Sequence, residues 1–463
     1  MFYASEVPVP AMTQCTEGSF EFAGHYTRQV VARFDGGAVT SDAGALLLRE
    51  AERRIGLIGR LAACFDDGRD ERYVEHGLSE MLAQRVYALA LGYEDVNDHE
   101  RLREDALFGL LSGKREAGRA RLAGKSTLNR LERGTGEPSR YCKIQCRQER
   151  FDGLLVDVFL EAHPEPPRRI VLDVDATDLP LHGRQEKRFF HGFYDEYCYL
   201  PLYIFAGEQL LCARLRAADG DAAAGVVQEL ERIVNQIRRR WPAVEIIVRG
   251  DSGFCREELM SWCEAHGVDY VLGLARNERL RRRIAGEMEQ ARRRQQETGR
   301  AARVFGEFQH ETTTGSWSRK RRVVAKAEML EGKENPRYVV TSLAAEEWPA
   351  QELYERLYCE RGEMENRIKE QLSLFAGRVS AETMRANQLR LNLSASAYVL
   401  VEALRRLGLK GTGMERAQVE TIRVRLLKIG ARIRVTARRI WVSMAEGFAL
   451  MEVFRQAWLQ LRC

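Results

Sequence analysis

Apolar residues at helical spacing dominate the first third of the chain. They recur every three or four positions through residues 73–92 and 98–112, the pattern of amphipathic helices. A further short helix is predicted over 126–131, where small polar residues precede the first leucine. A proline-rich bend at 163–167 ends this part of the chain. We therefore predict an all-α region over 40–165.

The pattern then changes to short apolar strands that alternate with helices. Strands are predicted at 169–175, 197–206, 208–216, 243–249 and 268–274, and helices at 222–239 and 255–265. This order of elements predicts a single mixed α/β sheet with flanking helices.

Residues 276–345 interrupt the alternation with an arginine-rich helix and three more strands, at 303–311, 320–328 and 337–343. Helix returns after residue 348, and a basic β-branched stretch at 432–443 predicts one last strand. The expected division is an extension at 1–39, a helical DNA-binding domain at 40–165, the first part of the sheet at 166–275, a β-rich basic insertion at 276–345, helices that complete the core at 346–408, and a basic C-terminal region at 409–463.

Charge is unevenly distributed along the 463 residues, although the formal net charge is only +5. Residues 276–338 hold 17 Lys and Arg against 9 Asp and Glu, and residues 401–463 hold 13 against 5. Two basic regions on an otherwise acidic chain favour a polyanion partner such as DNA or RNA. The alternative is a solvated helix face.

The sequence contains no apolar run of membrane-spanning length, and residues 1–20 lack the basic cluster and apolar core of a secretory signal. We therefore expect no membrane partner. The ten cysteines are expected to be reduced cytosolic thiols.

Candidate chemistry begins on the strand at 169–175. Its side chains alternate between two faces, so Asp173 and Asp175 share one face, opposite Leu172 and Val174. Two carboxylates on a core strand are costly unless they are paired or bind a cation. Either aspartate is therefore a candidate metal ligand.

Two further acids lie where the same sheet could bring them close. Asp251 follows the apolar strand 243–249, and ligand sites in α/β sheets lie beyond such strand ends. Glu365 lies in a helix predicted over 353–372, on one face with Tyr358, Arg361 and Lys369.

Three carboxylates from two strands and a helix can hold two Mg²⁺ ions about 4 Å apart, which suits phosphoryl transfer. The alternative for any one of these acids is a surface carboxylate or a helix salt bridge.

With these residues, the sequence resembles bacterial insertion-sequence transposases of the DDE type, in the group whose third motif is Y-x2-R-x3-E-x6-K. The matching positions are Asp175 before Ala176-Thr177, Asp251 in D-S-G-F, and Tyr358, Arg361 and Glu365. The resemblance extends over nearly the whole chain. It departs at the motif's lysine, where this sequence has Leu372, and Lys369 is a candidate substitute on nearly the same helix face.

The resemblance implies an RNase H-like mixed sheet with flanking helices, a β-rich insertion and an N-terminal all-α domain. It implies a DNA transposase in which Asp175, Asp251 and Glu365 bind two Mg²⁺ ions, with Mn²⁺ as a substitute. The implied partners are double-stranded transposon ends and target DNA, bound by a dimer or larger assembly, and the implied location is the bacterial cytoplasm at the nucleoid. Asp175 is favoured over Asp173 as first ligand because a small residue and a threonine follow it.

Further DNA contacts are predicted outside the acids. Those beside the third acid are Tyr358, Arg361 and Lys369. Those near a predicted hairpin tip are Trp317, Arg319, Arg321 and Arg322, and those in the short helix are Asn129 and Arg130. Trp317 has a packing role as its alternative, and the short helix a structural one. His182 and His191 flank an aromatic stretch that contacts nucleic acid or forms an ordinary loop.

An RNase H-like nuclease that only hydrolyses DNA remains an alternative function, as does a catalytically dead DNA-binding relative.

Overall fold

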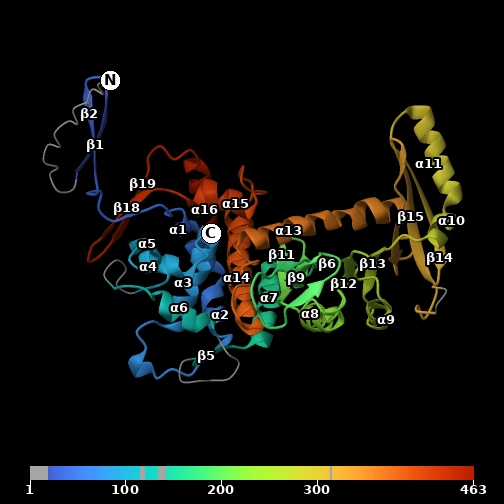
Figure 1. Ribbon diagram of the computed structural model, residues 1–463, viewed down its shortest axis with the longest axis horizontal. Coiled ribbons are helices and arrows are strands. Elements are labelled where there is room, and N and C mark those ends of the chain that lie inside the picture. The colour runs from blue at the N-terminus through green and yellow to red at the C-terminus, as the bar shows by residue number, and fades with distance from the viewer. Residues whose placement is uncertain (1–18, 115–119, 134–141, 313–314, 463) are drawn as a thin grey trace, which may run out of the picture.

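The computed structural model describes residues 19–114, 120–133, 142–312 and 315–462. Three regions lie side by side in it: a helical region, a central sheet and an outlying β-hairpin with two helices (Figure 1). One long helical rod crosses the sheet and links the outer regions (Figure 1). The catalytic candidates all lie on the central sheet or on this rod.

The central five strands run in the order β11-β10-β6-β12-β13. Their bounds are β6 Arg169–Ala176, β10 Leu202–Ala206, β11 Gln209–Arg214, β12 Glu245–Gly250 and β13 Asp269–Leu274. The strands β6, β10 and β11 pair antiparallel, while β12 and β13 run parallel to β6 and to each other. This is the strand arrangement of an RNase H-like core, so the predicted fold class is confirmed.

Helices cover one face of this sheet because the strands present apolar residues to it. On β6, Ile170, Leu172 and Val174 are buried in one cluster with residues of three helices. These helices are α7 Gln148–Ala162, α8 Val226–Arg240 and α9 Glu257–Ala265. The opposite face, to which Asp173 and Asp175 belong, packs against the helical rod and α14 (Met384–Gly408).

The insertion extends the central sheet instead of forming a separate body. The three predicted strands are confirmed as β14 Ala302–His310, β15 Arg321–Leu330 and β17 Arg337–Thr341, with short β16 Lys333–Glu334 beside β15. Because β17 pairs antiparallel with β13, the sheet becomes nine-stranded, and β13 is not left as an exposed edge. The arginine-rich stretch forms α10 Glu278–Arg283 and α11 Ala285–Thr298, and α11 packs on β14 and β15.

The rod that bears Glu365 is a run of four consecutive helical segments. They are α12 Ala350–Glu352, the π-helical η3 Leu353–Tyr358, the 3₁₀ turn η4 Cys359–Arg361 and α13 Gly362–Ser373. The predicted helix is therefore present, but its geometry is irregular just before the third acid. Single π-turns of this kind are frequent at functional sites.

The helical region is built around α14, whose side chains are buried on nearly every face. Its other elements are η1 Glu71–Tyr73, η2 Val96–Asp98, α1 Ala45–Ile55, α2 Leu57–Ala62, α3 Leu78–Leu91, α4 His99–Leu102, α5 Ala106–Leu111 and α6 Lys125–Glu132. The prediction of an all-α region was wrong in one respect. Strands β4 Phe65–Asp67 and β5 Ile144–Cys146 pair within it, a long-range contact that periodicity cannot reveal.

Both ends of the chain complete this region. The single strand predicted at 432–443 is a hairpin, β18 Ala431–Val435 and β19 Ile440–Met444, and β18 also pairs with β3 (Val39–Thr40). The remaining C-terminal elements are α15 Val419–Ile422, η5 Arg423–Leu427 and α16 Met451–Arg462. At the other end, β1 Ser19–His25 and β2 Arg28–Arg33 form a hairpin that projects from the body (Figure 1). In the described ranges, no helix has the length and apolar character needed to cross a membrane.

Gly44, at the start of α1, lies against the backbone of residues 426–427, and this contact can be tested by substitution. Its N–H donates to the carbonyl of Leu427 at 3.1 Å. A Cβ at Gly44 would come within 2.3 Å of the carbonyl oxygen of Leu426. We therefore expect Gly44→Ala to lower the free energy of unfolding by about 2–3 kcal/mol. In α2, a Cβ at Gly59 would meet nothing within 4 Å. Gly59→Ala should be neutral or stabilise by up to about 1 kcal/mol. Denaturant unfolding of both variants measures the difference, and equal values would rule out this docking.

Candidate active site

Asp175 and Asp251 lie side by side at one edge of the sheet. In the parallel pairing of β6 and β12, Gly250 aligns with Val174, so the next residue on each strand is an aspartate. Backbone N–H groups orient both carboxylates: that of Ala176 donates to Asp175 Oδ1 at 2.9 Å, and that of Gly253 donates to Asp251 Oδ1 at 2.8 Å. Burial raises the pKa of Asp175 to about 6 against the opposing charge of Arg361, and the negative charge of Asp251 adds to the rise.

Two glycines allow the chain segments to come this close. A Cβ at Gly250 would lie 2.8 Å from Val174 Cγ2. A Cβ at Gly273, on β13, would lie 2.6 Å from the Tyr358 hydroxyl and 2.9 Å from the amide nitrogen of Ser252. The Tyr358 ring therefore reaches over β13 to the turn that carries Asp251. Nothing in the sequence around Gly273 signals this requirement, which arises only from the packing of the rod on the sheet.

The rod brings Glu365 to the same edge through Arg361. The Arg361 guanidinium lies 3.2 Å from Asp175 Oδ2 through Nη1 and 3.8 Å from Glu365 Oε1 through Nη2. Glu365 is 58% exposed, whereas Arg361 and Asp175 are largely buried. The structure therefore gathers Asp175, Asp251, Tyr358, Arg361 and Glu365 in one place.

Lys369 lies four residues after Glu365 on α13. Its side chain is exposed, and it makes no ion pair within the described ranges. Leu372, at the position of the motif's lysine, is also exposed. The DNA contact predicted for Lys369 stays a prediction.

Asp173, the alternative first ligand, is fully engaged elsewhere. Arg249 on β12 donates from Nε to Asp173 Oδ1 at 2.5 Å and from Nη2 to Oδ2 at 2.8 Å, and both side chains are buried. Nη1 of the same guanidinium donates to the carbonyl of Leu357, in the π-helical turn. The pair therefore fastens the rod to β6, which carries Asp175, and to β12, which leads directly to Asp251. No pattern in the sequence indicated this role for Arg249.

The carboxylates suit a hard divalent cation such as Mg²⁺, which prefers oxygen ligands. Burial is the main cause of the raised pKa of Asp175, with a smaller contribution from the negative charge of Asp251, and a bound cation would stabilise both ionised carboxylates. In the described part of the chain, however, no three His, Cys, Asp or Glu side chains already form a ligand cluster. The Arg361 guanidinium contacts both Asp175 and Glu365 and so acts as their counter-charge.

The predicted contacts at the insertion hairpin have mainly structural surroundings. Trp317 packs on His310 with ring centroids 5.5 Å apart, which favours its alternative packing role. Arg321 is 2% exposed and pairs with Glu257 and Glu264 of α9. This surrounding does not fit the DNA contact predicted for Arg321, because two carboxylates already pair with its buried guanidinium.

The neighbouring Arg322 and Arg319 differ in how far they are enclosed. Arg322 pairs with Glu307 and donates to the backbone carbonyls of Leu343 and Trp348, so it too differs from its predicted role. Arg319 pairs with Glu264 at 3.2 Å but is mostly exposed, so it remains accessible to a ligand.

The helix α6 carries its two candidates near a cavity of about 350 Å³. Arg130 and Thr127 line this cavity, which Lys143 also borders. Arg130 is exposed, and its Nε donates to the carbonyl of Ser126 at 3.2 Å. Asn129 is half-buried on the same helix. The placement leaves both the structural and the DNA-binding interpretation of α6 open.

Comparison with known families decides the class of protein. The family model described as transposase DDE domain, group 1, matches residues 22–463. The chain belongs to this family of DDE transposases. Its fold is also similar to that in the cryo-EM structure of the piggyBac transposase synaptic complex with hairpin DNA, at a TM-score of 0.41 and 12% identity, covering 84% of this chain and 80% of that chain. No match was found among curated proteins.

The role of the Asp173–Arg249 ion pair beside the candidate site can be tested by measuring the stability of variants. Arg249→Met leaves Asp173 charged, buried and unpaired, so we expect a loss of about 3–5 kcal/mol in the free energy of unfolding. The double variant Asp173→Leu/Arg249→Met removes both charges and should recover most of this loss. Arg60→Met, in the more exposed pair with Glu161, is the matched control and should cost less than about 1 kcal/mol. Urea unfolding checks the set, and a loss at Arg249 no greater than at Arg60 would refute the role.

The pKa of Asp175 predicts a pH-dependent stability. The folded value is about 6 and the ordinary value is 3.8, so the folded protein binds this proton more tightly than the unfolded chain does. Ionisation therefore lowers stability progressively as pH rises from about 4 to above 6. Asp175→Asn, which cannot ionise, should raise the free energy of unfolding by up to about 2–3 kcal/mol at pH 8 and by much less at pH 4. Urea unfolding without divalent cations tests this, and the same gain at both pH values would contradict it.

Proposed function

We propose that the protein binds the terminal inverted repeats of an insertion sequence, nicks the DNA with Mg²⁺ and joins the freed 3′-hydroxyl to target DNA. The observation that carries this proposal is the adjacency of Asp175 and Asp251 at parallel strand ends, with Glu365 linked to them through Arg361. Membership of the DDE transposase family supports the same reaction class.

Asp175, Asp251 and Glu365 would hold two Mg²⁺ ions, or Mn²⁺ in their place. Bound there, the ions would supply activation of the attacking oxygen and stabilisation of the leaving oxygen. Arg361 is placed to exchange its carboxylate partners for the phosphate beside the cleaved bond, as a guanidinium binds phosphate in bidentate fashion. The Tyr358 hydroxyl, which lies over Gly273, would contact the same DNA strand as Arg361.

Duplex DNA would lie against surfaces outside this centre. We assign DNA binding to the helical region, including Asn129 and Arg130 on α6, to Arg319 in the insertion and to the basic C-terminal region. Pairing of two transposon ends would require a dimer or larger assembly, and the reaction would take place at the bacterial nucleoid.

A nuclease without strand transfer and a catalytically dead DNA-binding relative are the competing functions. Pre-cut transposon ends incubated with target plasmid and Mg²⁺ separate them. Joined products support the transposase. A nuclease would hydrolyse the ends without joining them, and a dead relative would bind them unchanged.

Asp251→Asn is expected to lower cleavage of transposon ends by at least about a thousand-fold, because a carboxylate that would hold the metal ions loses its charge. Binding of the uncleaved ends should stay within about two-fold of wild type, measured by gel shift. Asp269→Asn is the matched control. Asp269 begins β13, at the end of that strand away from Gly273 and the candidate site, and accepts a hydrogen bond from Ser342. It should cleave normally. Full cleavage by Asp251→Asn would remove this aspartate from the reaction.

A further inference from the structure

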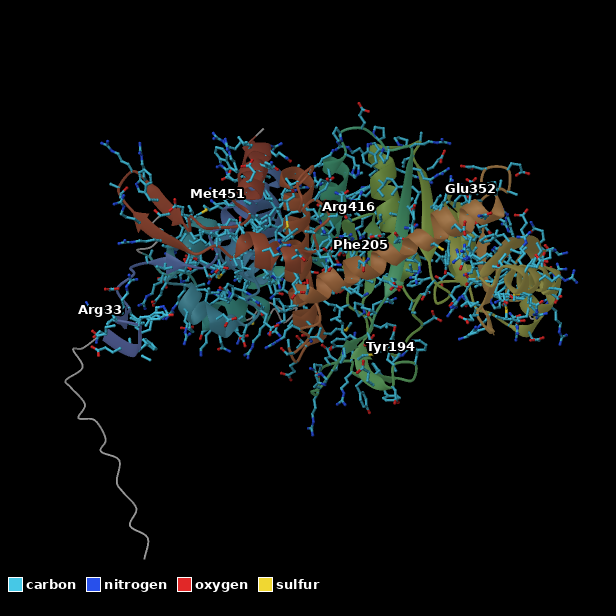
Figure 2. The ribbon with its side chains drawn as sticks, turned by 90° about the horizontal axis from the view of Figure 1, so that it is seen from above. Arg33, Tyr194, Phe205, Glu352, Arg416 and Met451 are labelled. Carbon is cyan, nitrogen blue, oxygen red and sulfur yellow. The ribbon has the colours of Figure 1, made fainter. Side chains whose placement is uncertain are left out.

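A small antiparallel sheet projects beside the acids and has no place in the mechanism above. We call residues 179–199 the flap. It consists of β7 Leu179–Pro180, β8 Phe189–His191 and β9 Glu196–Tyr199, in the order β7-β9-β8. Figure 2 shows Tyr194 on this segment, away from the body of the molecule and below the helical rod. The flap begins three residues after the end of the strand that carries Asp175.

The turn between β8 and β9 lies close to the residues that follow both aspartates. Tyr194, in this turn, packs on a small apolar cluster together with Ala176 and Ala222. Ala176 directly follows Asp175, and the Ala222 methyl lies 3.6 Å from the Cβ position at Gly253, two residues after Asp251. A ligand lying along the flap would therefore meet both aspartates near this turn.

Aromatic rings cover the outer surface of the flap. Phe193 is 84% exposed and Phe190 is 52% exposed, and Phe189 and Tyr197 are also exposed. Large apolar groups gathered on one projecting element are uncommon in water unless they bind something. The rings form two edge-to-face pairs, Phe190 with Tyr197 at 5.6 Å and Phe193 with Tyr194 at 5.0 Å between centroids.

Cations lie among these rings. Arg184, Lys187 and Arg188 make no ion pair within the described ranges, and the Arg188 guanidinium lies 3.8 Å from the centroid of the Tyr197 ring. Acidic residues lie on the flap as well. Glu186 and Asp195 are exposed, a Glu186 carboxylate oxygen accepts from the Met384 amide at 3.0 Å, and a hydrogen bond with Asp178 raises the pKa of Glu196. The flap therefore presents exposed aromatic rings beside three cations that have no ion-pair partner in the described ranges.

The flap is held rigidly enough to present this surface. Gln185 Nε2 donates to the Val379 carbonyl at 3.2 Å, and the Glu186 amide donates to the Glu382 carbonyl at 2.8 Å. Lys187 adopts a left-handed φ of 56°, which non-glycine residues rarely adopt and which recurs at ligand clamps. The base of the flap is thus tied to the segment between α13 and α14.

We propose that the flap binds unpaired DNA beside the cleaved phosphate, with bases stacked on Phe190 and Phe193 and the backbone paired with Arg184, Lys187 and Arg188. Aromatic faces bind single strands because every base can stack on them, and neighbouring cations bind the phosphates. A closed duplex would offer no free base face to the rings. This inference rests on the proposed transposase function.

Two fluorescent probes of one sequence test it: a blunt duplex and a duplex with one forked end of about six unpaired nucleotides. Affinities are measured by anisotropy with full-length protein in EDTA, so that no cleavage occurs. We expect wild type to bind the forked probe at least about five-fold more tightly than the blunt one. Phe190→Ala/Phe193→Ala should bring this ratio close to one and leave blunt-duplex affinity unchanged. Phe22→Ala, an equally exposed phenylalanine on the distant N-terminal hairpin, is the control and should keep the ratio.

A second variant examines the cations. Lys187→Ala/Arg188→Ala should reduce the salt dependence of forked-probe binding, because two phosphate contacts are lost. A wild-type ratio of one, or an unchanged ratio in the double phenylalanine variant, overturns the flap proposal while leaving the proposed function intact. An unchanged ratio together with a smaller assembly in size-exclusion chromatography would identify the flap as a subunit contact instead. Failure of wild type to bind either probe would overturn both proposals.

Discussion

The buried pair of Asp173 and Arg249 is the contact on which the candidate site depends. It joins β6 to β12 two residues before Asp175 and Asp251, and Arg249 Nη1 donates a further hydrogen bond to the Leu357 carbonyl of the rod. The Leu357 carbonyl lies in the π-helical turn, where the regular α-helical hydrogen-bond pattern changes, and the buried Arg249 guanidinium donates to it. Charge taken out of water in this way is costly, but it fixes three elements at one point. Asp175 and Asp251 can then lie side by side, and the rod connects Glu365 to Asp175 through Arg361.

The sequence predicted the elements of the core better than their long-range pairing. Apolar periodicity located β6, β12 and the rod because each buries a face that repeats along the chain. The assignment of Asp175 and Asp251 followed from strand alternation and strand ends, and the structure brings both together with Glu365. That these three acids are catalytic is still a prediction. Their proximity is a property of the sheet, which the strand order makes predictable.

What the sequence could not supply were partners distant along the chain. Arg249 lies two residues before a candidate acid, yet nothing indicated its pairing with Asp173, 76 residues earlier. Arg321 was predicted to contact DNA, but strand alternation in β15 turns it toward Glu257 and Glu264 on α9. The need for glycine at position 273 depends on where the Tyr358 ring falls, which only the packed rod determines.

The helical region is assembled from segments at opposite ends of the chain. Its core joins α1 and α3 to α14 and α16, and Ala43 donates its N–H to the carbonyl of Ile429. During translation, the first helices therefore leave the ribosome long before the segments that cover them. Their apolar faces stay uncovered until α14 and α16 have been made, and contacts between such distant residues form slowly. Completion of this region thus depends on synthesis of residues 384–462, and a chain that lacks them would expose its interior.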